Sequence, residues 1–75
     1  DAVDKKITLH SFTVDEEFRF LNQTIAQSHL GEHDSIVVAI ERNDELITLD
    51  KDTTFQLGDL VWIVGNRERL EKYCT

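Results

Sequence analysis

Two uninterrupted apolar stretches, residues 36–40 and 60–64, constrain the fold of this chain more than any other feature. Both are rich in β-branched side chains and bounded by polar or turn-forming residues, which is typical of buried strands. Alternation along the first stretch predicts Ile36, Val38 and Ile40 on one face, with Val37 and Ala39 on the other. A strand that is apolar on both faces has to be covered on both faces.

The chain has only 75 residues in which to provide that cover. A single core of this size contributes only about 3–5 kcal/mol, so small domains often gain stability from disulfides, metals or a partner. An internal disulfide is excluded because Cys74 is the only cysteine. We therefore expect the surplus apolar surface to meet another copy of the chain, as a homodimer, or another domain.

The first half of the chain predicts one strand and one helix. With side chains alternating between two faces, Ile7 and Leu9 lie on one face and Phe12 lies on the other. This change of face suggests a strand with a bulge near His10 and Ser11. A helix is expected over residues 22–30, with Asn22 as its N-cap and its end at Gly31.

The second half predicts a hairpin, a loop, a strand and a short helix. Asn43 and Asp44 form the hairpin turn, and residues 45–50 return as its second arm. In the loop over residues 50–59, Phe55 and Leu57 are expected to be anchors, and Gly58 permits the turn into the next strand. Asn66 then caps a helix with an apolar face of Leu70, Tyr73 and Cys74.

These elements predict an α+β fold, a small and mostly antiparallel sheet with two short helices in the order β-α-β-β-β-α. Residues 1–75 read as one domain without a linker. Because the chain does not begin with Met, we expect a fragment of a longer protein. No apolar run is long enough to span a bilayer, so direct membrane insertion of this segment is not expected.

The net charge of −7 argues against nucleic acids and anionic membrane surfaces as partners. His29 and His33 have the spacing of metal ligands, but Gly31 lies between them and no third ligand completes a site. The loop from Asp50 lacks the glycine and glutamate of a calcium loop. Neither the acids at 15–17 nor Cys74 has a catalytic partner, so no enzyme is predicted.

Arg42 is the most informative charge because it ends an apolar strand at a turn. An arginine there can bind a phosphate or carboxylate with two parallel hydrogen bonds, or it can pair with one of the fifteen acids. Trp62 is expected in the core or at an interface rather than as a stacking platform.

Residues 39–42 read "AIER", and residues 57–59 read "LGD" just before the second apolar stretch. In these segments the sequence resembles the TrkA C-terminal domain, also called RCK-C: Ala39, Ile40 and Arg42 match its "AIxR" motif, and "LGD" is similar to its "LxxGD" motif. The resemblance extends over nearly the whole chain. The family prefers glycine where Asn22 stands and proline near residues 49–50, and either departure can alter a turn without altering the fold.

The resemblance implies a cytosolic, dimeric, regulatory domain of a potassium channel, a potassium uptake system or a cation:proton antiporter, with "GDLVWIVG" most like the antiporters. It also implies a ligand site between two copies, suited to a nucleotide or cyclic dinucleotide. Arg42 and Asn43 would contact its polar groups, and Ile36 and Val37 its apolar parts. A purely structural assembly module without ligand is the alternative.

Overall fold

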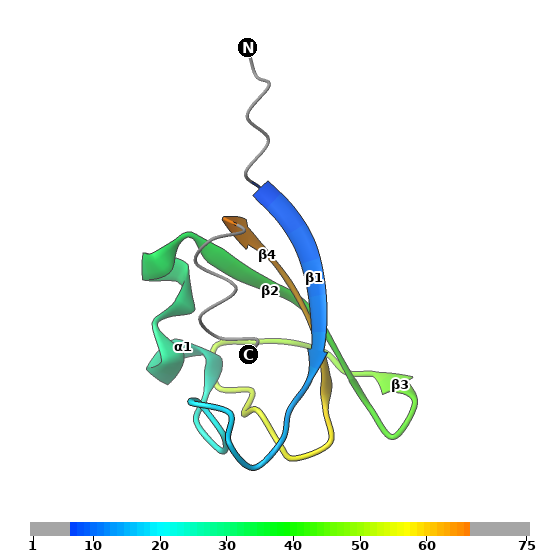
Figure 1. The fold of residues 1–75 in the computed structure, drawn as a ribbon. Coiled ribbons are helices and arrows are strands. Elements are labelled where there is room, and N and C mark those ends of the chain that lie inside the picture. The colour runs from blue at the N-terminus through cyan, green and yellow to red at the C-terminus, as the bar shows by residue number, and fades with distance from the viewer. Residues whose placement is uncertain (1–6, 67–75) are drawn as a thin grey trace.

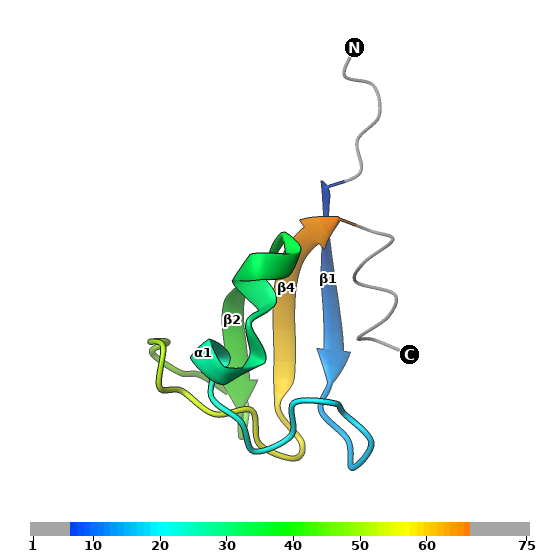
Figure 2. The ribbon, with the colours of Figure 1, turned by 90° about the vertical axis from the view of Figure 1, so that its left-hand side faces the viewer.

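The computed structural model describes residues 7–66, without the side chain of His33. They form a four-stranded antiparallel sheet in the order β1-β4-β2-β3 (Figure 1). The strands are β1 (Ile7–Thr13), β2 (Ser35–Arg42), β3 (Glu45–Leu46) and β4 (Leu60–Asn66). A short α-helix, α1 (Ile25–Ser28), and a 3-10 turn, η1 (Leu30–His33), lie across one face of the sheet (Figure 2).

The core lies between this helical layer and the inner face of the sheet. Val61 and Ile63 of the central strand β4 are fully buried there, together with Ile40 of β2. The ring of Phe18 packs against three others, tilted toward Phe12 and edge-on to Phe20 and Phe55, with centroid distances of 5.1, 5.7 and 5.3 Å. The remaining buried apolar residues of this cluster are Val14 and Leu30.

A bulge at Val38 overturns the predicted alternation in β2. Val37 pairs with Ile63 and Ala39 pairs with Trp62, so Val38 is an extra residue without a pairing partner on β4. One extra residue reverses the parity of the strand, so Val37 and Ile40 share the inner face. The prediction that Ile36, Val38 and Ile40 share one covered face is therefore wrong.

The bulge predicted near His10 and Ser11 is also absent, because β1 pairs with β4 without a shift from Ile7 to Thr13. Alternation alone places Ile7 and Leu9 on the outer face and Phe12 on the inner face. The change of parity that suggested a bulge is the consequence of apolar residues on both faces of one regular strand.

The predicted helix over residues 22–30 is shorter than expected and begins later. Thr24 is its N-cap, with a capping box in which Thr24 Oγ1 accepts from Gln27 N at 3.0 Å and Gln27 Oε1 accepts from Thr24 N at 2.9 Å. Asn22 lies in the preceding turn with a φ of 66°. The helix ends at His29, whose φ is 55°, rather than at Gly31, which lies inside η1.

The hairpin turn was predicted correctly, since Asn43 and Asp44 both have a positive φ, of 56° and 65°. Its second arm is much shorter than residues 45–50, because β3 contains only Glu45 and Leu46. In the following loop Phe55 is a buried anchor as predicted, but Leu57 is 59% exposed and anchors nothing. Gly58 has the positive φ, 90°, that the turn into β4 requires.

The sheet and α1 agree with an α+β fold. The helix predicted after Asn66, with Leu70, Tyr73 and Cys74, lies outside the described residues.

Candidate functional site

Arg42 and Asp59 form a closed polar network where β2 ends and β4 is about to begin. Arg42 Nε donates to Asp59 Oδ1 at 2.9 Å, and Arg42 Nη2 donates to Asp59 Oδ2 at 2.9 Å. Arg42 Nη2 also donates to the carbonyl oxygen of Thr54 at 3.0 Å, and Gln56 N donates to Asp59 Oδ2 at 2.9 Å. Asp59 is only 1% exposed, so this pair holds the loop before β4 against the end of β2.

The backbone brings these two residues together by identifiable means. The bulge at Val38 restores Ile40 to the inner face, and Arg42 follows it two residues later on the same side. Gly58 turns the loop so that Asp59 O accepts from Val14 N at 2.8 Å, while Gly58 N donates to Val14 O at 2.9 Å. The loop before β4 is thereby fixed to the chain that leaves β1.

Electrostatics favour the charged form of both partners. Burial acts to raise the pKa of Asp59, but the hydrogen bonds from Arg42 and Gln56 and the charge of Arg42 outweigh it, so the pKa is lowered. The hydrogen bond to Asp59 raises the pKa of Arg42, against the opposing effect of burial. The pair is an ion pair throughout the physiological pH range.

The four residues predicted to contact a ligand occupy different parts of β2 and its hairpin. Ile36 points outward and is 62% exposed, whereas Val37 packs against the core on the opposite face. Arg42 lies six residues further along the strand, which is about 20 Å of extended chain, and Asn43 is exposed in the turn. Within one copy of the chain, Ile36 and Val37 therefore face opposite ways and lie far from the hairpin.

Sequence reasoning gave Asp59 no role beyond a match to the family motif. The sequence allowed Arg42 to pair with one of the fifteen acids but did not identify Asp59 as that acid. The spatial proximity depends on the order of strands in the sheet, which the linear sequence does not state.

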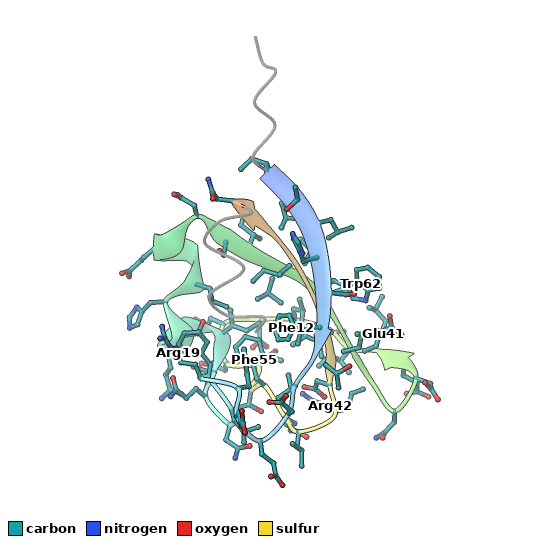
Figure 3. All side chains as sticks on the ribbon, in the orientation of Figure 1. Phe12, Arg19, Glu41, Arg42, Phe55 and Trp62 are labelled. Atoms are coloured by element: carbon teal, nitrogen blue, oxygen red, sulfur yellow. The ribbon has the colours of Figure 1, made fainter. Side chains whose placement is uncertain are left out.

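The outer face of the sheet, opposite α1, carries the surplus apolar surface that the sequence predicts. Leu9, Val64 and Ile36 lie in one row across β1, β4 and β2, and Ser11, Trp62 and Ala39 lie in the next. Figure 3 shows Trp62 and Glu41 on the side of the sheet away from Phe12 and Phe55. Trp62 Nε1 donates to Glu41 Oε2 at 3.0 Å.

A shallow, open hollow of about 460 Å³ lies between the chain after β1 and the loop before β4. Its lining is Val14, Asp15, Glu16, Glu17, Leu57 and Gly58. Asp15 Oδ1 accepts from Glu17 N at 2.9 Å, which is a local turn contact. Asp15, Glu16 and Glu17 are all exposed, so this segment is a solvated turn.

Among the described residues, no three His, Cys, Asp or Glu side chains lie close enough together to hold a metal ion. His29 Nδ1 instead lies 3.2 Å from Glu32 Oε2, in an exposed pair. No helix among residues 7–66 has both the length and the apolar character needed to cross a membrane.

Compared with models of known protein families, residues 9–75 match the TrkA-C domain. A comparison with curated proteins found no match. The family match covers most of the chain and includes both members of the Arg42–Asp59 pair. The chain therefore belongs to the TrkA-C family, whose domains are regulatory parts of ion-transport proteins.

Proposed function

We propose that this chain is the regulatory, ligand-sensing and dimerising domain of a monovalent cation transport protein, carrying K⁺ or Na⁺ and H⁺. Residues 1–75 form the domain, and it acts on the cytosolic side of the membrane, tethered to a transmembrane portion of the same protein or complex. The observation that carries the proposal is the TrkA-C match over residues 9–75. The polar network between Arg42 and Asp59 joins a loop to a strand, which is a structural role.

The ligand would bind between two copies and favour one relative orientation of them. That orientation would shift the conformational equilibrium of the attached transporter. A nucleotide or cyclic dinucleotide fits the proposal best. Its polar groups would meet Asn43 and the Nη1 side of Arg42, because Nε and Nη2 already bind Asp59 and Thr54. Ile36, at the other end of the strand, would be an apolar contact supplied by the second copy. Val37, proposed for the same role, packs against the core on the opposite face of the strand.

Thermal unfolding with a panel of nucleotides, cyclic dinucleotides and divalent cations tests this function. We expect one class of ligand to raise the melting temperature of the wild type and to raise that of Asn43→Ala less. Thr48→Ala, exposed beyond the hairpin, is the matched control and should respond like the wild type. Asn43 is preferred to Arg42 for this test because the loss of Arg42 also destabilises the fold.

A structural assembly module without ligand is the second candidate. It is favoured by the positions of Ile36 and Val37 on opposite faces of β2, because one ligand cannot contact both side chains from the same strand. If no ligand in the panel shifts the melting temperature of the wild type, the sensing function is wrong and the assembly function remains.

A further inference from the structure

We propose that the hairpin end of the outer face binds an amphipathic helix from a cytosolic segment of the transport protein, with a lysine or arginine set among its apolar side chains. This rests on the proposed function and names a surface through which the domain contacts the transporter. The surface, called here the Trp62 patch, consists of Leu9, Ala39, Glu41, Leu46 and Trp62.

The strand register brings these side chains together. Ala39 is opposite Trp62 across β2 and β4, and Glu41 is opposite Leu46 across β2 and β3. Leu9 lies on β1 diagonally from Trp62. Side chains that are opposite or diagonal on one face of a sheet are within reach of one another. The patch therefore crosses all the strands of the described sheet.

The patch is apolar and open in the described part of the chain. Leu46 is 72% exposed and Leu9 is 58% exposed, although both are large apolar side chains on a sheet. Trp62 is half-buried on the central strand between them. Apolar side chains that adjoin across a sheet mark an interaction site, whereas one exposed alone in a loop, such as Leu57, does not.

Glu41 gives the patch a chemical preference. By the strand register, it is the only charged side chain that the four described strands direct to the outer face. Trp62 Nε1 donates to Glu41 Oε2 at 3.0 Å, and Figure 3 shows the two side chains on the same side of the sheet. The carboxylate is thereby held beside the indole. A cation that pairs with Glu41 can also lie over the indole ring, and both contacts attract it.

This combination fits a partner that is both apolar and cationic. Its apolar side chains would cover Leu9, Ala39 and Leu46, and one lysine or arginine would meet Glu41. A second copy of the chain fits less well, because a two-fold contact centred on the patch would bring two Glu41 carboxylates together without a cation. An anionic partner is repelled by Glu41 and by the net charge of −7.

Cytosolic segments of transport proteins have the required composition. Loops and helix ends on the cytosolic side of a membrane carry an excess of lysine and arginine, and amphipathic helices at this boundary combine them with an apolar face. In the proposed function the domain is tethered to such a protein, which keeps the local concentration of the segment high. Ile36, which the proposed function assigns to the ligand, lies at the other end of β2 and outside the patch.

Binding of synthetic peptides to the full chain tests the patch. The probe is an Ala-rich peptide of about 18 residues, long enough to be helical in water, with a leucine stripe that contains one arginine. Its companion carries glutamine in place of the arginine. The readout is the emission of Trp62, the single tryptophan, which should shift to shorter wavelength as a peptide covers it. We expect the arginine peptide to bind the wild type about tenfold more tightly than the glutamine peptide.

Glu41→Gln isolates the charge, because its side-chain oxygen can still accept from Trp62 Nε1. This variant should bind the two peptides equally. Glu16→Gln is the matched control, since it removes the same charge from an exposed turn and should retain the wild-type preference. Leu46→Ser should weaken the binding of both peptides by the same factor. Circular dichroism confirms that the variants remain folded.

The proposal is overturned if the wild type and Glu41→Gln bind the arginine peptide equally, or if about 1 mM peptide leaves the emission of Trp62 unchanged. Emission that depends on protein concentration without peptide would show that a second copy covers the patch. A shift with phosphatidylcholine vesicles but not with the peptide would show that lipid covers it. Either result also overturns the proposal.

The ligand panel of the proposed function separates the two conclusions. A ligand that raises the melting temperature while the arginine peptide fails to bind would retain the sensing function and remove this surface. Preferential binding of the arginine peptide without any ligand response would retain the surface and remove the sensing function.

Discussion

The carboxylate of Asp59 binds the guanidinium of Arg42 through two hydrogen bonds of 2.9 Å, although 17 residues separate them in the chain. Asp59 lies at the turn that leads into the central strand, and Arg42 ends the strand beside it. The pair therefore fixes the position of a loop relative to the sheet. Its energetic role can be measured directly.

Replacing Arg42 with methionine should lower the free energy of unfolding by about 2–4 kcal/mol, because Asp59 is left buried without its cation. Urea unfolding followed by circular dichroism measures this. Lys51→Met is the matched control, since it removes the same charge from an exposed loop and should change stability by less than about 0.5 kcal/mol. Equal losses in the two variants would show that the pair does not stabilise the fold.

The pair should also give the protein a distinct sensitivity to acid. The pKa of Asp59 is lowered from its ordinary value of 3.8, so its contribution is fully present above that pH and is lost as the pH falls through the folded-state pKa. The stability difference between the wild type and Asp59→Asn should be constant from pH 7 to about pH 5 and should narrow in more acidic solution. A difference that stays constant down to the lowest pH at which the protein folds would contradict a lowered pKa.

Gly65 is expected to tolerate no side chain. A Cβ at this position would lie 2.7 Å from the carbonyl oxygen of Asp34 and 3.0 Å from Ser35 Oγ. The nearest atom belongs to the backbone, so Gly65→Ala should destabilise the fold by about 1–3 kcal/mol. Gly31→Ala, with nothing within 4 Å of the new Cβ, is the control and should unfold at nearly the wild-type urea concentration.

Asn22 should accept glycine but not a β-branched residue, because its φ is 66°. Asn22→Gly is expected to remain within about 0.5 kcal/mol of the wild type, and Asn22→Val to lose about 1–2 kcal/mol. Melting temperatures of both, with Gln23→Val as the neighbouring control, test this. The same φ explains how asparagine can stand where the family prefers glycine.

A charge should have opposite consequences at the two faces of the sheet. Ile63 is 1% exposed on the inner face, so Ile63→Asp should unfold the domain, with a loss of about 3 kcal/mol or more. Val38 is half exposed at the bulge, so Val38→Asp should leave the monomer folded within about 1 kcal/mol. Thermal unfolding at the lowest measurable protein concentration compares them, and equal destabilisation would mean that Val38 is covered in the monomer.

Features determined by adjacent residues were accessible from the sequence. The strands over residues 36–40 and 60–64 follow from their apolar composition, and the hairpin turn follows from Asn43 and Asp44, which tolerate a left-handed backbone. The start of the helix was also encoded locally, because Thr24 and Gln27 have the spacing of a capping box. Asn22 was preferred only because it also belongs to the residue types that cap helices.

Features determined by pairing between distant segments were not accessible. The bulge at Val38 is defined by the register with β4, and two successive apolar residues give no sign of which is extra. The same register decides that Arg42 meets Asp59 and that Ile36 is exposed. Sequence reasoning identified Arg42 as important, but its structural partner became apparent only in the folded sheet.

The central position of β4 has a consequence for how the protein is made. β4 pairs with both β1 and β2, yet it is the last strand of the described sheet to be synthesised. On the ribosome β1 therefore has no neighbouring strand until residues 60–66 emerge. Until then β2 can pair only with the two-residue strand β3. Folding of this sheet is accordingly a late and concerted event, and nascent chains that stall before residue 60 expose unpaired strands to aggregation.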